Sequence, residues 1–219
     1  MKRTLGACCS LLLLAAGAQA PAAPLWSSDF EDVRVGSEPD GALVLQGEFL
    51  VAQEDGDKFL ELPGSPLETM GLLVGPARRD GVSVTARAMG ERKGRQSPSF
   101  GVGLCGARGY RLMVVPMRNA VELVREEDLV ARIEYKWVPG RWTWLRLSVS
   151  KVGESSWAIR GQVWAEGQSP AEGCTIDTQV DDPPPSGGAS LWGVPYSGRP
   201  IRYDDLTYKE LEPPLGGSP

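Results

Sequence analysis

Residues 141–150 of the chain read RWTWLRLSVS, and this stretch decides the fold. Its side chains form two alternating sets, one largely apolar and one polar with two tryptophans: Thr143, Leu145, Leu147 and Val149 in the first, and Trp142, Trp144, Arg146, Ser148 and Ser150 in the second. Successive side chains of a β-strand project to opposite faces of its sheet. The stretch therefore predicts a strand that packs on a core through one face and meets solvent through the other.

The same alternation continues on both sides of this strand. Residues 110–115 and 120–125 predict a hairpin around the turn at 116–119, and residues 156–165 predict the strand that follows 141–150. Trp192, further along the chain, is predicted to lie in the core.

Turn residues separate the predicted strands. Glycine (27) and proline (18) are frequent, yet 42% of the chain is hydrophobic, which favours a turn-rich β protein over disorder. About a dozen short strands without an amphipathic helix between them predict an all-β, antiparallel, two-sheet sandwich. A break at Gly47 divides residues 42–53, and residues 167–188, with three consecutive prolines, are predicted to be a long loop. The last strand, 201–209, is expected to pair beside the first, as in a jelly roll.

Residues 1–20 have the layout of a secretory signal peptide. They begin with Lys2 and Arg3, continue through an apolar run, and end with small residues at Ala18 and Ala20, either of which could precede the cleavage site. Residues 25–211 are predicted to form one jelly-roll domain and residues 212–219 a flexible C-terminal tail. The expected location is secreted or periplasmic.

The charge of the chain bears on its partners. The full chain has 23 basic and 28 acidic residues, and removal of residues 1–20, which contain two basic residues and no acid, leaves 21 and 28, a net charge of −7. An acidic chain without a basic run argues against nucleic acid as a partner. The leader's apolar run is shorter than the roughly 20 residues of a membrane-spanning helix, so we expect no membrane insertion after cleavage.

Cys105 and Cys174 are the two cysteines that remain after such a cleavage. In an oxidising compartment they predict a disulfide, and closing so long a loop would stabilise the fold by about 4 kcal/mol in the chain-entropy model. The alternative is two buried thiols that never meet.

Several segments together resemble the concanavalin A-like lectin/glucanase jelly-roll domain: DFED at 29–32, VSVTARAM at 82–89, FGVGL at 100–104, IRGQVW at 159–164, GGASLWG at 187–193 and IRYDDLTYKEL at 201–211. The similarity is greatest to the laminin-G-like and 3-keto-disaccharide-hydrolase-like branches of secreted bacterial proteins, and it covers residues 25–211. It implies the jelly-roll fold. The motifs are structural, and one fold of this kind hosts many functions.

The catalytic patterns of enzymes with this fold are missing. Glucan-cleaving members carry Glu-x-Asp-x-x-Glu on one strand, which sets two carboxylates across a glycosidic bond, and no such spacing occurs here. Residues 122–128, ELVREED, contain acids without that spacing and are predicted to lie over a turn. The chain has no histidine, the commonest acid–base side chain near neutral pH. The 3-keto branch has Asn-Ser-Gly where this chain reads SPSFGVGL at 97–104.

The resemblance also implies a structural calcium ion between the first and last strands. Calcium prefers six to eight oxygen ligands. The candidate ligands are Asp29, Glu31, Asp204 and Asp205. The alternative is a set of solvated acids, with Asp204 and Asp205 marking a β-bulge.

The outward face of the two central strands is the predicted binding site for a glycan or cell-surface polysaccharide. Its residues are Trp144, Arg146, Arg160, Gln162 and Trp164, with Arg132 and Glu134 extending the row on the preceding strand. Aromatic rings stack on sugar rings, and polar neighbours orient the hydroxyls. The alternative is that loop 167–188 covers the tryptophans as a satellite core.

Three functions remain open at this point. The first is an exported, non-catalytic carbohydrate-binding domain, and the second is a glycoside-active hydrolase with a divergent carboxylate pair. The third is a structural or adhesion domain whose exposed face binds another protein.

Overall fold

The stretch that decides the fold forms strand β11 (Thr143–Lys151), at the centre of a sheet. Thr143, Leu145, Leu147 and Val149 are buried, and the side chains between them are partly exposed, as the alternation predicted. β11 pairs antiparallel with β6 (Val82–Gly90) and with β12 (Trp157–Ala165). Trp142 lies just before the strand begins.

The computed structural model describes residues 23–211; the predicted signal peptide and the predicted tail lie outside the described residues. The remaining strands, in chain order, are β1 (Trp26–Ser28), β2 (Ala42–Gln46), β3 (Leu50–Glu54), β4 (Asp57–Leu62), β5 (Met70–Arg78), β7 (Ser99–Leu104), β8 (Tyr110–Val115), β9 (Ala120–Arg125), β10 (Asp128–Glu134), β13 (Cys174–Val180), β14 (Gly187–Val194) and β15 (Ile201–Glu210). One 3-10 turn, Pro116–Arg118, connects the predicted hairpin of β8 and β9.

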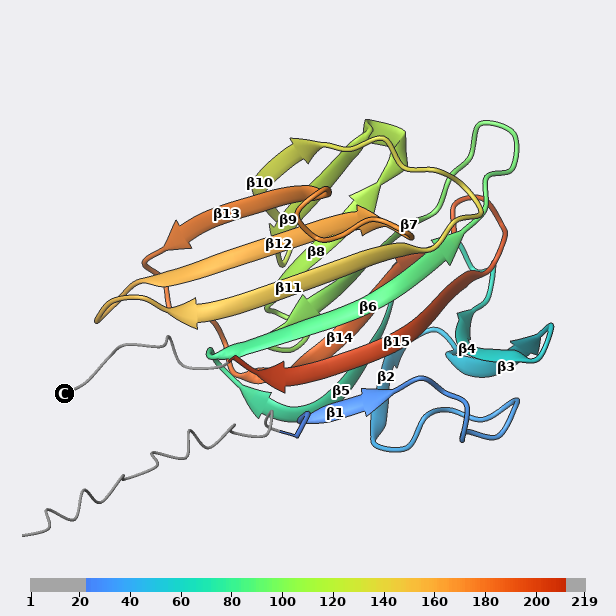
Figure 1. Ribbon diagram of the computed structural model, residues 1–219, viewed down its shortest axis with the longest axis horizontal. Coiled ribbons are helices and arrows are strands. Elements are labelled where there is room, and N and C mark those ends of the chain that lie inside the picture. The colour runs from blue at the N-terminus through green and yellow to red at the C-terminus, as the bar shows by residue number, and fades with distance from the viewer. Residues whose placement is uncertain (1–22, 212–219) are drawn as a thin grey trace, which may run out of the picture.

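The strands form two antiparallel sheets that pack face to face as a jelly-roll sandwich (Figure 1). The eight-stranded sheet has the order β13-β12-β11-β6-β15-β4-β3, with β1 paired to β15. The seven-stranded sheet has the order β10-β9-β8-β7-β14-β5-β2. The predicted fold class is therefore confirmed.

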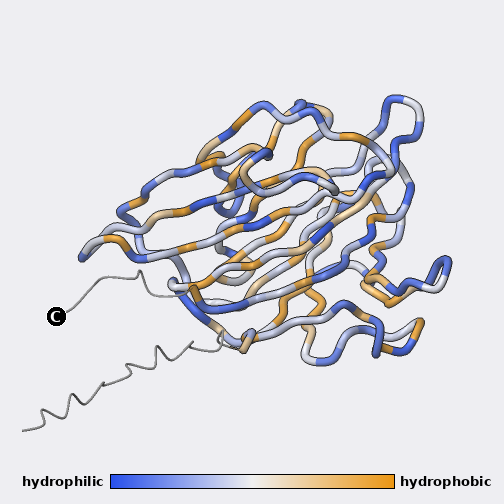
Figure 2. The backbone as a smooth tube through the Cα atoms, viewed as in Figure 1, coloured by the Kyte–Doolittle hydropathy of each residue, from blue (hydrophilic) through white to orange (hydrophobic). Residues whose placement is uncertain are grey.

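The core lies between the sheets. Leu145 and Leu147 of the eight-stranded sheet and Leu112, Val102 and Leu191 of the seven-stranded sheet are all completely buried in one cluster. Burying a large aliphatic side chain stabilises a fold by about 1.5–3 kcal/mol. Figure 2 shows apolar and polar residues alternating along many of the strands.

Two further predictions are confirmed: the pairing of the last strand with the first, and the break at Gly47. β15 pairs with β1, so the last strand lies beside the first. The break at Gly47 divides β2 from β3, and these two strands belong to opposite sheets.

The loop predicted for residues 167–188 is partly wrong, because it contains β13, the edge strand that pairs with β12. Only Ile176 of this strand is fully buried. Its other positions are mostly polar, since an edge strand with a solvated outer face needs few apolar residues. The alternation was therefore too weak to indicate a strand.

The predicted disulfide is also wrong: Cys105 and Cys174 are free thiols. The Cys105 Sγ donates to the Arg79 carbonyl oxygen at 3.1 Å. The next residue, Asp80, accepts a hydrogen bond from the Nε1 of Trp157, the first residue of β12, so Cys105 lies near the start of that strand. Cys174 pairs with Val163, six residues further along β12 and so roughly 20 Å away along the strand. That separation is far beyond the reach of a disulfide.

Within residues 23–211, no helix has the length and apolar character needed to cross a membrane.

Candidate functional site

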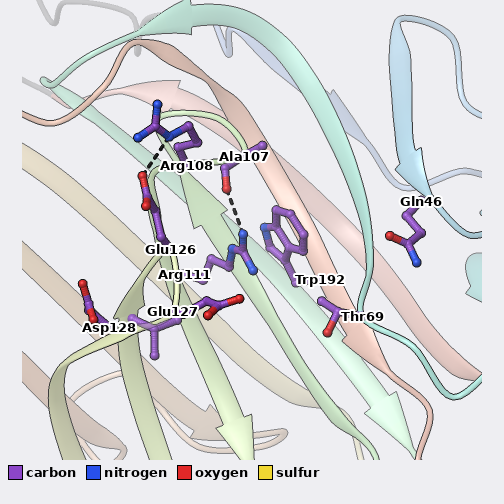
Figure 3. Close-up of a pocket in the computed structure, with 10 residues that line it drawn as sticks. Gln46, Thr69, Ala107, Arg108, Arg111, Glu126, Glu127, Asp128 and Trp192 are labelled. Atoms are coloured by element: carbon purple, nitrogen blue, oxygen red, sulfur yellow. Dashed lines mark hydrogen bonds and ion pairs between the residues drawn. The ribbon is translucent and has the colours of Figure 1, made fainter.

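The outer face of the seven-stranded sheet is hollowed near the β7–β8 loop and the β9–β10 turn. The hollow has a volume of about 830 Å³. Figure 3 shows the residues that line it: Gln46, Thr69, Ala107, Arg108, Arg111, Val124, Glu126, Glu127, Asp128 and Trp192. Pockets of roughly 300–1,000 Å³ are typical of sites for small ligands.

An arginine stacked on a tryptophan forms the floor of this hollow. The Arg111 guanidinium carbon lies 3.6 Å from the centroid of the Trp192 ring. The Trp192 Nε1 donates to the Ser190 Oγ (2.7 Å), and the Arg111 Nη2 donates to the Ala107 carbonyl oxygen (2.8 Å). These bonds hold both flat groups in place.

Glycines of the neighbouring strands allow the indole to lie flat on the sheet. A Cβ at Gly71 would be 2.6 Å from the Cζ3 of Trp192, and a Cβ at Gly103 would be 3.1 Å from its Nε1. Real Cβ contacts are essentially never as short as the first. The flat position of the Trp192 ring therefore requires a glycine at position 71 of β5, the cross-strand partner of Trp192 in β14.

Charged side chains of both signs form the rim. The Arg108 Nε donates to the Glu126 Oε1 at 2.8 Å, Glu127 follows in the β9–β10 turn, and Asp128 begins β10. No carboxylate within the described chain forms an ion pair with Arg111, and its Nε is buried without a hydrogen-bond partner. Burial lowers the pKa of Arg111, and the charges of Glu126 and Glu127 oppose the shift.

This arrangement suits the recognition of hydroxyl groups. Carboxylates accept hydrogen bonds from hydroxyls, and guanidinium groups donate to them. The planar floor offers a surface for a ring, and the fixed polar groups around it would set the ring's orientation.

Trp192 was predicted to lie in the core, and it is buried, but on the outward side of its sheet and not in the cluster between the two sheets. Its neighbour Leu191 fills the core, so Trp192 projects to the opposite face, where only 6% of it remains exposed. The signal was present in the alternation of β14 and in the glycines at 101 and 103, which share an outward face next to it. Small residues on both faces of β14, GGASLWGV, obscured this alternation.

The predicted binding face lies on the other side of the sandwich, on the eight-stranded sheet. We call Trp144, Arg146, Arg160, Gln162 and Trp164 the tryptophan face. As predicted, these side chains project away from the core. The rings of Trp144 and Trp164 stack on each other, 6.0 Å apart at the centroids and 5° from parallel.

The groups of the tryptophan face bind one another more than they face solvent. Trp164 is 6% exposed, and the Arg146 guanidinium lies 5.4 Å from its ring centroid. The Arg146 Nε donates to the Thr85 Oγ1 at 3.2 Å, while Arg160 stays exposed, 4.0 Å from a carboxylate oxygen of Asp177. The two rings therefore cover each other, and of the pair Trp144 keeps the partly exposed surface.

Arg132 and Glu134 do not extend the tryptophan face, so that part of the prediction is wrong. Both belong to β10, in the seven-stranded sheet. The Arg132 Nη2 donates to the buried Glu122 carboxylate at 2.6 Å, and Arg118 binds the same carboxylate at 3.0 Å. Chain order placed β10 before β11, but the connection between them crosses to the opposite sheet.

Of the predicted calcium ligands, Asp29, Glu31, Asp204 and Asp205, only Asp29 and Asp205 line a common pocket, so the four do not converge as a set. The Arg87 Nη2 lies 2.5 Å from the Asp204 Oδ2, and the Arg87 Nε lies 2.9 Å from the Asp205 Oδ2. The Glu31 Oε1 accepts from the Lys58 backbone N–H at 2.8 Å. Among residues 23–211 no three histidine, cysteine, aspartate or glutamate side chains are grouped to hold a metal ion. These residues do not fit calcium. The alternative of a bulge agrees with the register shift after Asp204 and the positive φ of Asp205 (50°).

Solved structures share this architecture. The carbohydrate-binding module CBM66 from Bacillus subtilis matches with a TM-score of 0.53 and 13% identity, over 78% of this chain and 96% of that one. The shared fold is the two-sheet jelly-roll sandwich. The metal-free carbohydrate recognition domain of Emp46p matches with a TM-score of 0.51 and 11% identity, over 86% and 98% of the two chains.

Enzymes also share the jelly roll. A mutant of the alginate lyase Aly36B in complex with alginate trisaccharide matches with a TM-score of 0.57 and 10% identity, over 85% of this chain and 98% of that one. The sequence matches no protein-family model and no curated protein. At these identities the structural likeness shows the fold alone.

Proposed function

We propose that this protein is a non-catalytic carbohydrate-binding domain that holds a glycan in the hollow of the seven-stranded sheet. The observation that carries the proposal is the Arg111–Trp192 stack at the floor, within a rim of paired charges. Lectin-like and carbohydrate-binding domains among the structural neighbours support the class of function.

The chemistry of the rim favours an uncharged glycan. Arg108 and Arg111 face Glu126, Glu127 and Asp128, so the hollow has no strong excess of positive charge to attract an acidic polymer. Neutral hydroxyls can donate to the carboxylates and accept from the guanidinium groups at the same time. We therefore place neutral hexoses ahead of uronates as ligands.

The seven-stranded sheet is a better candidate than the tryptophan face for a geometric reason. A glycan needs a recess with free hydrogen-bonding groups around a flat floor. On the tryptophan face, Trp144 and Trp164 cover each other, and Arg146 is held by Thr85. The tryptophan face remains a second surface, which the experiment below tests directly.

A glycoside-active enzyme is the alternative that the lyases and hydrolases among the neighbours keep open. Among the described residues, the carboxylates that line the hollow are Glu126, Glu127 and Asp128, and Glu126 is engaged by Arg108. We propose a binding role for these acids. Release of reducing sugar from a glycan panel would indicate the enzyme instead.

Matched arginine substitutions test the proposal. Arg111 and Arg146 are both stacked near a tryptophan, on opposite faces of the sandwich. After a neutral glycan ligand has been selected on an array, calorimetry should show that Arg111→Ala weakens binding at least about tenfold, since a hydrogen bond to a charged group contributes about 1.5–3 kcal/mol. Arg146→Ala should leave the affinity within about twofold.

The reverse result would move the site to the tryptophan face. Binding that survives both substitutions, or a panel without any bound glycan, would refute the proposal. The melting temperatures of both variants must stay close to that of the original protein for the comparison to be valid.

We also propose that the protein is exported, on the strength of residues 1–20. N-terminal sequencing of protein recovered from the medium or periplasm should find a chain that begins just after Ala18 or Ala20. A chain that retains Lys2 and Arg3 would contradict this.

A further inference from the structure

A second pocket, separate from the hollow, lies at one end of the sandwich. It has a volume of about 430 Å³, roughly half that of the hollow. The connection between β10 and β11 forms one wall, and the connection between β12 and β13 forms the other. The two sites share no lining residue.

Backbone hydrogen bonds hold both walls of this pocket in place. In the first wall, the Tyr135 N–H donates to the Asn119 carbonyl oxygen at 2.9 Å. In the second, the Glu166 N–H donates to the Trp142 carbonyl oxygen at 3.0 Å, which links the two connections. The pocket is therefore formed before a ligand arrives, which lowers the entropic cost of binding.

A glycine brings the second wall close to the sheet. A Cβ at Gly173 would lie 2.2 Å from the Val163 carbonyl oxygen and 2.7 Å from the Trp164 Cβ. No larger residue fits without moving β12. The next residue, Cys174, then lines the pocket.

Hydroxyl and thiol groups gather inside the pocket. Tyr135, Thr143 and Cys174 all line it, and they come from β10's end, β11 and β13. Burial raises the pKa of Tyr135, and a hydrogen bond with the Thr143 side chain opposes that shift. Burial also raises the pKa of Cys174. All three groups are therefore uncharged near neutral pH and can form neutral hydrogen bonds.

An indole provides the apolar part of the lining. The guanidinium carbon of Arg87 lies 4.6 Å from the centroid of the Trp142 ring and so covers one face of it. Trp142 also lines the pocket, together with the exposed Val138. An aromatic residue and hydroxyl groups in one lining are a combination suited to a ring that carries both C–H and O–H groups.

Charges at the mouth balance one another. Lys136 and Arg141 bring two positive charges, and Glu134 and Glu172 bring two negative ones. The Glu172 Oε2 already accepts from the backbone N–H and the Oγ of Ser169, each at 2.7 Å. No net charge remains to select an ion.

From these features we infer that the pocket is a second binding site, for a single neutral sugar ring. Its size admits one ring rather than a polymer segment, its interior groups are neutral donors and acceptors, and its lining includes an aromatic residue. The inference does not depend on the hollow, because the two sites are lined by different residues.

Indole N–H resonances allow each site to be followed separately. The protein labelled with nitrogen-15 is titrated with D-glucose, D-galactose, D-mannose and D-xylose, one at a time. At least one sugar should shift the Trp142 indole signal and saturate. The shift should persist in Arg111→Ala, which alters the hollow, and should disappear in Val138→Trp, which narrows the mouth. Val138 is 49% exposed, so the larger side chain leaves the core unchanged.

Alkylation of Cys174 provides a second measurement. With iodoacetamide at about pH 9, the bound sugar should slow modification of Cys174 about tenfold when its concentration is ten times its Kd. Cys105 is the internal control, because it is 1% exposed and burial raises its pKa to about 12.

Several results would overturn the inference. One is the absence of any Trp142 shift or Cys174 protection with all four sugars. Another is a shift that is lost in Arg111→Ala and kept in Val138→Trp, because the sugar would then occupy the hollow alone. A site in the pocket with no binding in the hollow would support this inference and refute the proposed function, so the two can fail separately.

Discussion

The two outer faces of the sandwich both carry tryptophan and arginine, but they use them differently. On the eight-stranded sheet, Trp144 stacks on Trp164 with the planes 5° apart, and Trp164 is buried while Trp144 is partly exposed. On the seven-stranded sheet, Trp192 lies flat over Gly71, with Arg111 above it at the floor of a hollow of about 830 Å³. Similar residues thus fill one face and line a recess on the other.

The difference follows from the neighbouring positions. Trp144 and Trp164 are direct cross-strand partners, so their rings stack on each other. Trp192 has Gly101 and Gly71 as its cross-strand partners in β7 and β5. With no side chain on either side, its ring can lie along the sheet, and the Arg111 guanidinium stacks on it as the floor of the hollow.

The largest expected effect comes from removing the tryptophan of each face. Trp192→Ala should weaken glycan binding about thirtyfold, or about 2 kcal/mol, as expected for a buried aromatic anchor. Trp164→Ala should lower the melting temperature, because it removes a stacked and buried ring, but should leave the affinity within about twofold. Isothermal titration calorimetry with thermal unfolding of both variants checks this. Equal losses of affinity would erase the distinction between the two faces.

A smaller effect is expected from filling the space beneath the indole. Gly71→Ala places a Cβ 2.6 Å from the Trp192 ring, so the ring must tilt. Binding should weaken about tenfold, and the free energy of unfolding should fall by about 1–3 kcal/mol, as for overpacking. The control is Gly153→Ala in the β11–β12 turn, where the nearest atom, the Ser156 Cβ, is 3.5 Å away. If both variants bind alike, Trp192 does not need its flat position.

The charged groups beside the tryptophan face should affect stability and not binding. Burial raises the pKa of Asp204 above its ordinary value of 3.8, against the hydrogen bond from the Asp205 backbone N–H and the hydrogen bond and charge of Arg87. The folded state therefore holds this proton more tightly than the unfolded state. Its contribution to stability is full below pH 3.8 and is lost as the pH rises through the raised pKa.

Urea denaturation across acidic pH measures this contribution. In Asp204→Asn the contribution is absent, so the difference in unfolding free energy between the variant and the original protein should change with pH in that window. Glycan binding at neutral pH should not change. Parallel stability curves would show that the pKa of Asp204 is the same in the folded and unfolded states.

The smallest effect is expected from calcium. Arg87 and Lys58 already occupy the carboxylates and backbone oxygens near β1 and β15. Addition of calcium, or of a chelator, should therefore shift the melting temperature by less than about 1 °C, since a ligand stabilises a fold only by binding it. A clear rise with calcium would mean that Arg87 releases Asp204 and Asp205 to the ion.

Alternation in the sequence predicted much of the fold. It identified the apolar face of residues 143–149, the hairpin of β8 and β9, and the outward direction of Trp144 and Trp164. It failed for β13, whose polar edge lacked contrast. It also did not indicate on which side of its sheet Trp192 is buried, because that strand has small residues on both faces. The disulfide prediction failed because compartment chemistry says nothing about the distance between Cys105 and Cys174.

The sequence by itself determined that the chain folds as two antiparallel sheets, because period-two alternation is a local property of each strand. Only the tertiary structure decided which sheet each strand joins, and therefore that Arg132 lies on the face opposite Arg146. It also decided which outward face is hollow, because an open recess depends on cross-strand neighbours such as Gly71 and Gly101, which are distant from Trp192 in the chain.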